Sequence, residues 1–113
     1  MSVTIYYNPR CSTSRATLNL LRERGVEPVV IEYLMTPPTV EELTALLGLL
    51  GLSARQILRK KDAKAVGLEA TGLEETALIA AMVENPAVIE RPIVVANGRA
   101  VLGRPPEKVL ELL

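Results

Sequence analysis

The sequence predicts an α/β protein in which a mixed four-stranded sheet is interrupted by a helical insert between the second and third strands. Three observations support this. Runs of β-branched and aromatic residues occur near both ends of the 113-residue chain, helical periodicity fills its middle third, and an Asn-Gly dipeptide near the C-terminus separates two apolar runs. A hydrophobic content of 49% is enough for one core, so we expect a single domain.

The first third of the chain has the pattern strand, helix, strand. Residues 3–7 are β-branched and aromatic and end at Asn8-Pro9, and good helix formers follow from 13 to 24. Gly25 is a typical helix terminator, and a second β-branched run covers 29–33. Such a unit of about thirty residues places its two strands parallel and joins them by a right-handed crossover.

The insert begins where the periodicity becomes helical. Thr39 and Glu42 have the spacing of a capping box, and apolar residues follow at intervals of three and four. Further helices are predicted at 54–59 and from about 73 to 84, separated by a polar stretch at 60–64. Pro86 ends the last of them, so we expect the insert to span 37–86.

Strand composition returns in the last third. Residues 92–96 and 99–102 flank Asn97-Gly98, the strongest hairpin signal in the chain, and should be antiparallel neighbours. Pro105 and Pro106 open a final helix. The order β-α-β, helices, β-β-α is the thioredoxin-like arrangement, with its core at 1–36 and 87–113.

Composition excludes several classes of partner. Thirteen basic and 13 acidic residues cancel to a net charge of +0, which gives no positive field for nucleic acid or an anionic membrane. The N-terminus has no signal-peptide pattern, and the longest near-apolar stretch is too short to span a bilayer. We therefore expect a cytoplasmic protein, and a monomer, because no long coiled coil or exposed apolar stripe is visible.

Two absences narrow the chemistry. The chain has no histidine, which excludes a Ser-His or Cys-His dyad and a histidine metal ligand within one chain. It has one cysteine, which excludes an internal disulfide, a Cys-x-x-Cys pair and a thiolate zinc site. We expect no metal and no bound cofactor. If Cys11 does redox chemistry, its second sulfur must come from another molecule.

Cys11 lies where the first strand leads into the first helix. Free backbone N–H groups at a helix start favour negative charge, so they should stabilise a thiolate there. Arg10 and Arg15 add positive charge, and Ser14 can present its hydroxyl or N–H to the sulfur. The supporting loop comprises Asn8, Arg10, Ser12, Thr13, Ser14 and Arg15. The alternative is that Cys11 is a small buried apolar residue beside a capping Ser12 or Thr13, but two flanking arginines make burial unfavourable.

The sequence Ile5-Tyr6-Tyr7-Asn8-Pro9-Arg10-Cys11-Ser12-Thr13-Ser14-Arg15 resembles the active-site loop of the arsenate reductase (ArsC/Spx-like) family. Further motifs of that family are matched, in the right order, by Leu58-Arg59-Lys60, by Glu90-Arg91-Pro92-Ile93-Val94-Val95 and by Gly103-Arg104-Pro105. The resemblance covers nearly the whole chain. It implies a thioredoxin/glutaredoxin-like fold with a helical insert.

The same resemblance implies roles for particular residues. Cys11 would be the nucleophile, and Arg59, Arg91 and Arg104 would converge on the oxyanion. Arginine suits this task because it stays charged and offers a planar fork of donors. Pro92 resembles the cis-proline that faces the cysteine in thioredoxin-like folds. The implied substrate is arsenate or a similar oxyanion, with glutathione as co-substrate and glutaredoxin clearing the mixed disulfide.

Departures from the family pattern keep alternatives open. Tyr7 stands where enzymatic members carry histidine, which predicts weaker thiolate activation, and Gly103 stands where some relatives carry cysteine. One alternative is a regulatory or binding module of the Spx type, which contacts RNA polymerase. A dithiol sensor is excluded because position 14 is serine. The other alternative is a glutaredoxin-like thiol transferase, which gives no reason for three converging arginines.

Overall fold

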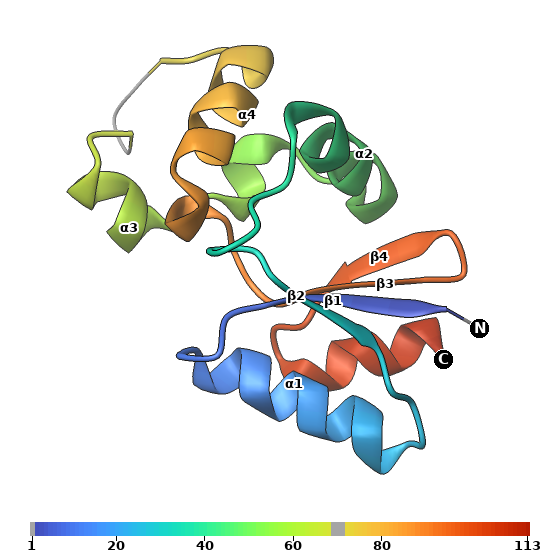
Figure 1. Ribbon diagram of the computed structural model, residues 1–113. Coiled ribbons are helices and arrows are strands. Elements are labelled where there is room, and N and C mark those ends of the chain that lie inside the picture. Colours follow the sequence, from blue (N-terminus) through green and yellow to red (C-terminus); the bar gives the residue numbers. More distant parts are fainter. Residues whose placement is uncertain (1, 69–71) are drawn as a thin grey trace. The chain divides into compact units, whose positions relative to one another are not determined.

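A computed structural model describes residues 2–68 and 72–113 and divides the chain into two compact units. The sheet unit comprises Met1–Thr36 and Arg91–Leu113, and the helical unit comprises Pro37–Glu90. Figure 1 follows the chain by colour from the first strand through the helical unit to the last helix. The two parts of the sheet unit, far apart in sequence, thus meet in one sheet.

The sheet has the strand order β2-β1-β3-β4. Its strands are β1 (Val3–Tyr7), β2 (Val29–Glu32), β3 (Ile93–Ala96) and β4 (Arg99–Leu102). β1 pairs parallel with β2, while β3 is antiparallel to both β1 and β4 (Figure 1). The crossover between the parallel strands is α1 (Ser12–Glu23). This confirms the predicted class, a mixed four-stranded sheet of the thioredoxin-like kind with helices inserted between β2 and β3.

The sheet buries one face against two helices. In the register of the central strands, Val3 lies opposite Ala96 and Ile5 opposite Val94, so alternate residues of both strands point to the same side. There they meet α1 and the C-terminal 3₁₀ helix η3 (Pro106–Leu112), which also contact each other. The buried cluster consists of Val3, Ile5, Leu18, Leu21, Val94, Ala96, Val109 and Leu112.

The hairpin between β3 and β4 follows from its turn residues. Asn97 and Gly98 have φ values of 55° and 70°, both in the left-handed region that a two-residue type I′ turn requires. The predicted antiparallel pairing is therefore confirmed. The final helix that Pro105 and Pro106 open is present, but it has the tighter 3₁₀ form.

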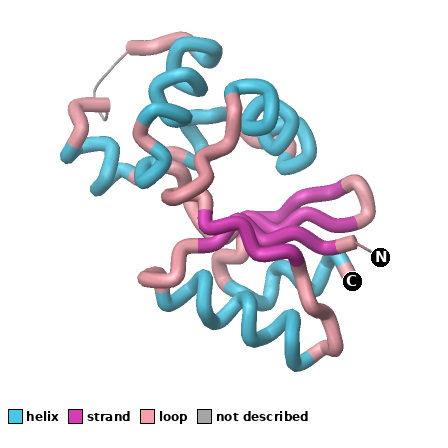
Figure 2. The backbone as a smooth tube through the Cα atoms, in the orientation of Figure 1, coloured by secondary structure: helices cyan, strands magenta, loops and turns pink. Residues whose placement is uncertain are grey.

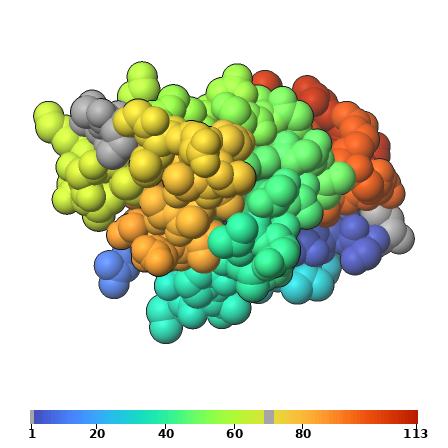
Figure 3. All heavy atoms as spheres, turned by 90° about the horizontal axis from the view of Figure 1, so that it is seen from above, coloured from blue at the N-terminus to red at the C-terminus, as the bar shows by residue number. Residues whose placement is uncertain are grey.

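The helical unit contains more helix than we predicted. Its elements are α2 (Val40–Leu50), η1 (Ala54–Ile57), α3 (Lys60–Ala65), α4 (Glu75–Glu84) and η2 (Pro86–Val88). The capping box is confirmed: Glu42 N donates to Thr39 Oγ1 at 3.1 Å, and Thr39 N donates to Glu42 Oε1 at 3.0 Å. α2 and α4 pack together, and Figure 3 shows both at the surface of this unit. α3 replaces the polar stretch expected at 60–64.

The boundary between the units lies at 90/91, not at 86/87 as expected. Residues 88–90 are bonded back to the segment after η1: Arg59 N donates to Val88 O at 2.7 Å, and Glu90 N donates to Ile57 O at 2.8 Å. Between these bonds Leu58 and Ile89 form an isolated antiparallel bridge. Pro86 ends α4, but the chain stays attached to the helical unit for four more residues.

Candidate active site

The loop between β1 and α1 is one of the pink segments in Figure 2. It is shaped by Asn8, which is buried. Its Oδ1 accepts from Arg10 N at 2.9 Å, and its backbone oxygen accepts from Cys11 N at 3.0 Å. Its own N–H donates to Ser14 Oγ at 3.4 Å. These bonds satisfy polar groups of the turn within the turn itself, and they hold Cys11 at the N-cap of α1.

Cys11 presents its sulfur to the start of the helix. Its backbone is extended, with φ −94° and ψ 119°. Burial raises the pKa of the half-buried Cys11 thiol, but hydrogen bonds to the thiolate outweigh this and lower the pKa from 9.0 to about 7. The donors are the Ser14 N–H and hydroxyl, then the Arg91 side chain, then the Thr13 N–H. The geometry activates the sulfur without a histidine.

A pKa near 7 predicts the pH dependence of Cys11 reactivity. The alkylation rate with iodoacetamide should reach half its maximum at about pH 7, where a thiol of ordinary pKa is only a few per cent ionised. Ser14→Ala removes one donor and should move that midpoint upward, whereas Ser12→Ala should leave it in place. The depressed pKa also stabilises the fold, fully above the unfolded pKa of 9.0, and this contribution is lost as pH falls through about 7. A midpoint near pH 9 in the folded protein would contradict the assignment.

Two arginines of the sheet unit lie beside the sulfur. Arg104 spreads its guanidinium over three acceptors: Nε donates to Arg91 O at 2.9 Å, Nη1 lies 3.5 Å from Thr13 Oγ1, and Nη2 lies 3.9 Å from Cys11 Sγ. Arg91 hydrogen-bonds the thiolate through its side chain. Each arginine precedes a proline in a cis peptide bond; the bond before Pro92 was anticipated, and the one before Pro105 was not.

The other loop residues take different positions. Ser12, Arg10 and Arg15 are exposed, and Arg15 Nη1 donates to Pro9 O at 2.8 Å, so it braces the loop. Neither Arg10 nor Arg15 is among the groups that shift the pKa of Cys11. The charge assistance expected from these neighbours is supplied by Arg91 instead.

Arg59 belongs to the helical unit and is held by carboxylates there. Its Nε lies 2.8 Å from Asp62 Oδ2 and its Nη1 lies 2.9 Å from Glu90 Oε1. Burial lowers the pKa of Arg59, but hydrogen bonds to these two carboxylates raise it above its ordinary value. Two of its five N–H donors are thereby used. Its part in binding an oxyanion stays a prediction from the resemblance.

Gly103 is a site residue whose structural role sequence reasoning missed. A Cβ at this position would lie 2.9 Å from Pro92 Cγ and 3.0 Å from Thr17 Oγ1, closer than side chains normally pack. Thr17 is itself fully buried and donates to Thr13 O at 2.8 Å. The missing side chain therefore lets the segment carrying Arg104 approach α1 and Pro92 directly. No local sequence signal distinguishes such a glycine from a turn glycine.

A matched pair of glycine variants tests this packing. Gly103→Ala should destabilise the protein by about 1–3 kcal/mol, because the new methyl group overpacks a buried contact. Gly48→Ala, in α2 with no heavy atom near the added Cβ, should instead stabilise by about 0.5–1 kcal/mol. Urea unfolding of both variants gives the comparison, and equal effects of the two substitutions would contradict the close approach at Gly103.

Tyr7, the departure from the family histidine, is part of the core. Together with three other partly buried residues it packs against the apolar cluster beneath the sheet. It is not among the groups that shift the pKa of Cys11. The Cys11 thiolate is thus stabilised by the start of α1 and by Arg91, and the side chain at position 7 takes no part in this.

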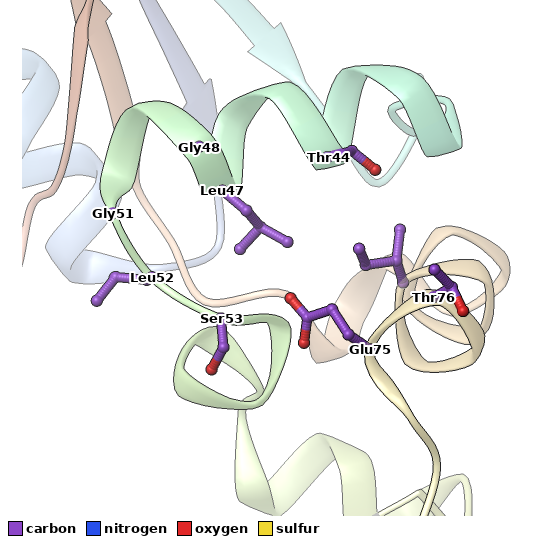
Figure 4. Close-up of a pocket in the computed structure, with 9 residues that line it drawn as sticks. Thr44, Leu47, Gly48, Gly51, Leu52, Ser53, Glu75 and Thr76 are labelled. Carbon is purple, nitrogen blue, oxygen red and sulfur yellow. The ribbon is translucent and has the colours of Figure 1, made fainter.

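The other cavity and surface features offer few groups that could take part in catalysis. A hollow of about 540 Å³ lies between α2 and α4 (Figure 4), and among the described residues lining it only Glu75 is charged. That carboxylate already accepts from Ala54 N at 2.9 Å. Within residues 2–68 and 72–113, no cluster of three or more potential metal-binding side chains occurs. No helix in those ranges is long and apolar enough to cross a membrane.

Comparison with known proteins gives a consistent result. The model of the ArsC family matches residues 6–112. The chain is 57% identical to the uncharacterized protein YfgD of Escherichia coli K12, over 98% of this chain and 96% of that one. It is 48% identical to an arsenate reductase of Neisseria meningitidis serogroup B, over 98% and 97%. A solved arsenate reductase from Vibrio cholerae superposes with a TM-score of 0.94 at 54% identity, over 100% and 98%.

Proposed function

This chain belongs to the ArsC family, and from that premise we propose that it is an arsenate reductase in which Cys11 forms a covalent adduct with arsenate. One observation carries the proposal: a thiol with a pKa of about 7 sits with Arg91 and Arg104 around it. A nucleophile ionised at neutral pH, beside fixed positive charge, suits attack on a tetrahedral oxyanion.

The reaction balances with external thiols. The Cys11 thiolate attacks arsenic(V), forming a sulfur–arsenic bond, while an arsenic-bound hydroxyl takes a proton from solvent and leaves as water. A glutathione thiolate then attacks the Cys11 sulfur. An S–S bond forms between the two sulfurs while the sulfur–arsenic bond breaks, and its electron pair leaves with arsenic, which becomes arsenic(III). Glutaredoxin reduces the mixed disulfide and restores the thiolate. Because the chain has one cysteine, the second sulfur has to come from such a co-substrate.

The arginines stabilise charge during these steps. Arg91 and Arg104 hold the oxyanion and the negative charge of the adduct, and Arg59 joins them as the resemblance implies. Asn8, Thr13 and Ser14 keep the sulfur aligned. We propose a monomeric cytoplasmic enzyme that needs no bound metal or prosthetic group, with glutathione and glutaredoxin as its partners.

Coupled NADPH oxidation tests the proposal. The purified protein is mixed with glutathione, glutaredoxin and glutathione reductase, with and without arsenate. Arsenate-dependent oxidation is expected, and it should vanish after iodoacetamide treatment, which modifies the single thiol. A folded, alkylatable protein without arsenate-dependent turnover would refute the reductase. Reduction of hydroxyethyl disulfide would then indicate a thiol transferase, and its absence a binding module of the Spx type.

A further inference from the structure

A small cavity lies beside the Cys11 loop, within the sheet unit. It has a volume of about 250 Å³ and is lined by Asn8, Pro9, Arg10, Glu32, Leu34 and Met35, which we call the loop pocket. One wall is the segment that directly precedes Cys11, and the other is the turn that follows β2. A molecule covalently attached to Cys11 could therefore extend into the pocket.

The side-chain amide of Asn8, in the loop pocket, has donors that no described residue uses. Asn8 is 4% exposed, and its Oδ1 is fixed by accepting from Arg10 N. Its Nδ2 donors are consequently directed elsewhere, and no described residue accepts from them. Nδ2 is not one of the buried side-chain atoms of the described residues that lack a partner, so it reaches solvent and is available to donate to a carbonyl or carboxylate oxygen of a ligand.

The charges of the loop pocket are also uncompensated. Arg10 and Glu32 have opposite sign, yet they form no ion pair with each other or with any described residue. Leu34 and Met35 add exposed apolar surface, at 37% and 81% exposure. An inorganic oxyanion would be repelled by Glu32 and would gain nothing from apolar walls. An organic zwitterion with a methylene stem would use all of these groups.

We propose that the loop pocket binds the γ-glutamyl end of glutathione when its sulfur is bonded to Cys11, a refinement that rests on the proposed function. That end carries an ammonium and a carboxylate on one carbon, complementary to Glu32 and Arg10, and its amide carbonyl is an acceptor for Asn8 Nδ2. A volume of about 250 Å³ is smaller than the ~300–1,000 Å³ of sites enclosing a whole drug-sized ligand. It suits one end of the tripeptide.

Thiol exchange without arsenate tests the subsite. The Cys11–glutathione mixed disulfide is equilibrated with cysteinylglycine, which lacks only the γ-glutamyl group. The Cys11–glutathione S–S bond breaks, a Cys11–cysteinylglycine S–S bond forms, and glutathione leaves as the thiol, with no net oxidation. Intact-protein mass spectrometry gives the equilibrium ratio. Comparing this ratio between variants cancels intrinsic differences between the two thiols and any change in the thiolate pKa of Cys11.

Each charge variant of the loop pocket should shift the ratio. Arg10→Gln and Glu32→Gln should each weaken the preference for glutathione by about two- to fivefold, the range for one solvent-accessible ion pair. Leu34→Trp, which fills the cavity, should weaken it by about tenfold. The matched controls Arg24→Gln and Glu23→Gln, at exposed positions elsewhere in the unit, should leave the ratio unchanged.

Equal ratios in the wild-type protein and all three pocket variants, each shown by thermal unfolding to be folded, would overturn the subsite. The result would also show that glutathione is held elsewhere or only by its disulfide bond. If the reductase assay fails but the exchange ratio shifts in the pocket variants, arsenate is excluded as the substrate and the glutathione subsite still stands. The two failures are therefore distinguishable.

Discussion

Replacing Cys11 by serine is expected to lower arsenate-dependent NADPH oxidation by about a thousandfold or more. The serine hydroxyl is not ionised near neutral pH and cannot form a disulfide with glutathione, so both the attack on arsenic and the electron transfer to it are lost. The chain has no second cysteine that could substitute. The coupled assay with glutathione and glutaredoxin measures the effect.

The same variant should be well folded, which makes a loss of activity interpretable. Cys11 is the N-cap of α1, and serine is among the residues preferred at that position. Urea unfolding at pH 6, where the ionisation of Cys11 adds little stability, should therefore give a stability equal to or above that of the wild-type protein. Arsenate-dependent turnover that survives in folded Cys11→Ser would exclude the covalent mechanism.

The parts of the fold that the sequence predicted well are those determined by neighbouring residues. The Thr39–Glu42 capping box and the Asn97-Gly98 turn each act within four residues, and both formed as expected. Helix α3 was missed for a related reason. Its sequence Lys60–Ala65 shows no apolar periodicity, its only buried residue is Ala63, and its N-cap Arg59 makes no side-chain cap. Backbone contacts made after Pro86, rather than local propensity, extend the helical unit to Glu90.

In the candidate site, too, features set by neighbouring residues could be predicted, whereas features set by tertiary packing could not. The position of Cys11 at a helix start, and the donation from Ser14, follow from the strand-loop-helix pattern and could be predicted. The close approach at Gly103 brings it against Thr17, 86 positions earlier in the chain, so no local pattern reports it. The ion pairs of Arg59 with Asp62 and Glu90 likewise depend on tertiary packing. The sequence predicted which arginines belong to the site, but it did not predict which groups hold each of them.

Removal of the Arg104 side chain should produce the second large effect. Arg104→Ala deletes three donors at once, toward Arg91 O, Thr13 Oγ1 and Cys11 Sγ. Loss of a donor aimed at developing negative charge typically costs about 100- to 1,000-fold in turnover. We expect a decrease of that size in kcat/KM for arsenate, measured in the coupled assay.

Arg104→Lys tests whether the positive charge of Arg104 is sufficient for activity or whether the planar guanidinium is also needed. A lysine ammonium keeps the positive charge, but a single nitrogen cannot reach three acceptors that lie in different directions around a planar fork. Its activity should therefore fall between that of Arg104→Ala and the wild-type protein. Arg99→Ala is the matched control, because this exposed arginine of β4 donates to Glu111 O, away from the sulfur. If Arg104→Ala keeps the kcat/KM of the Arg99→Ala control, Arg104 does not contact the reacting oxyanion, and Arg91 must be the principal cation beside Cys11.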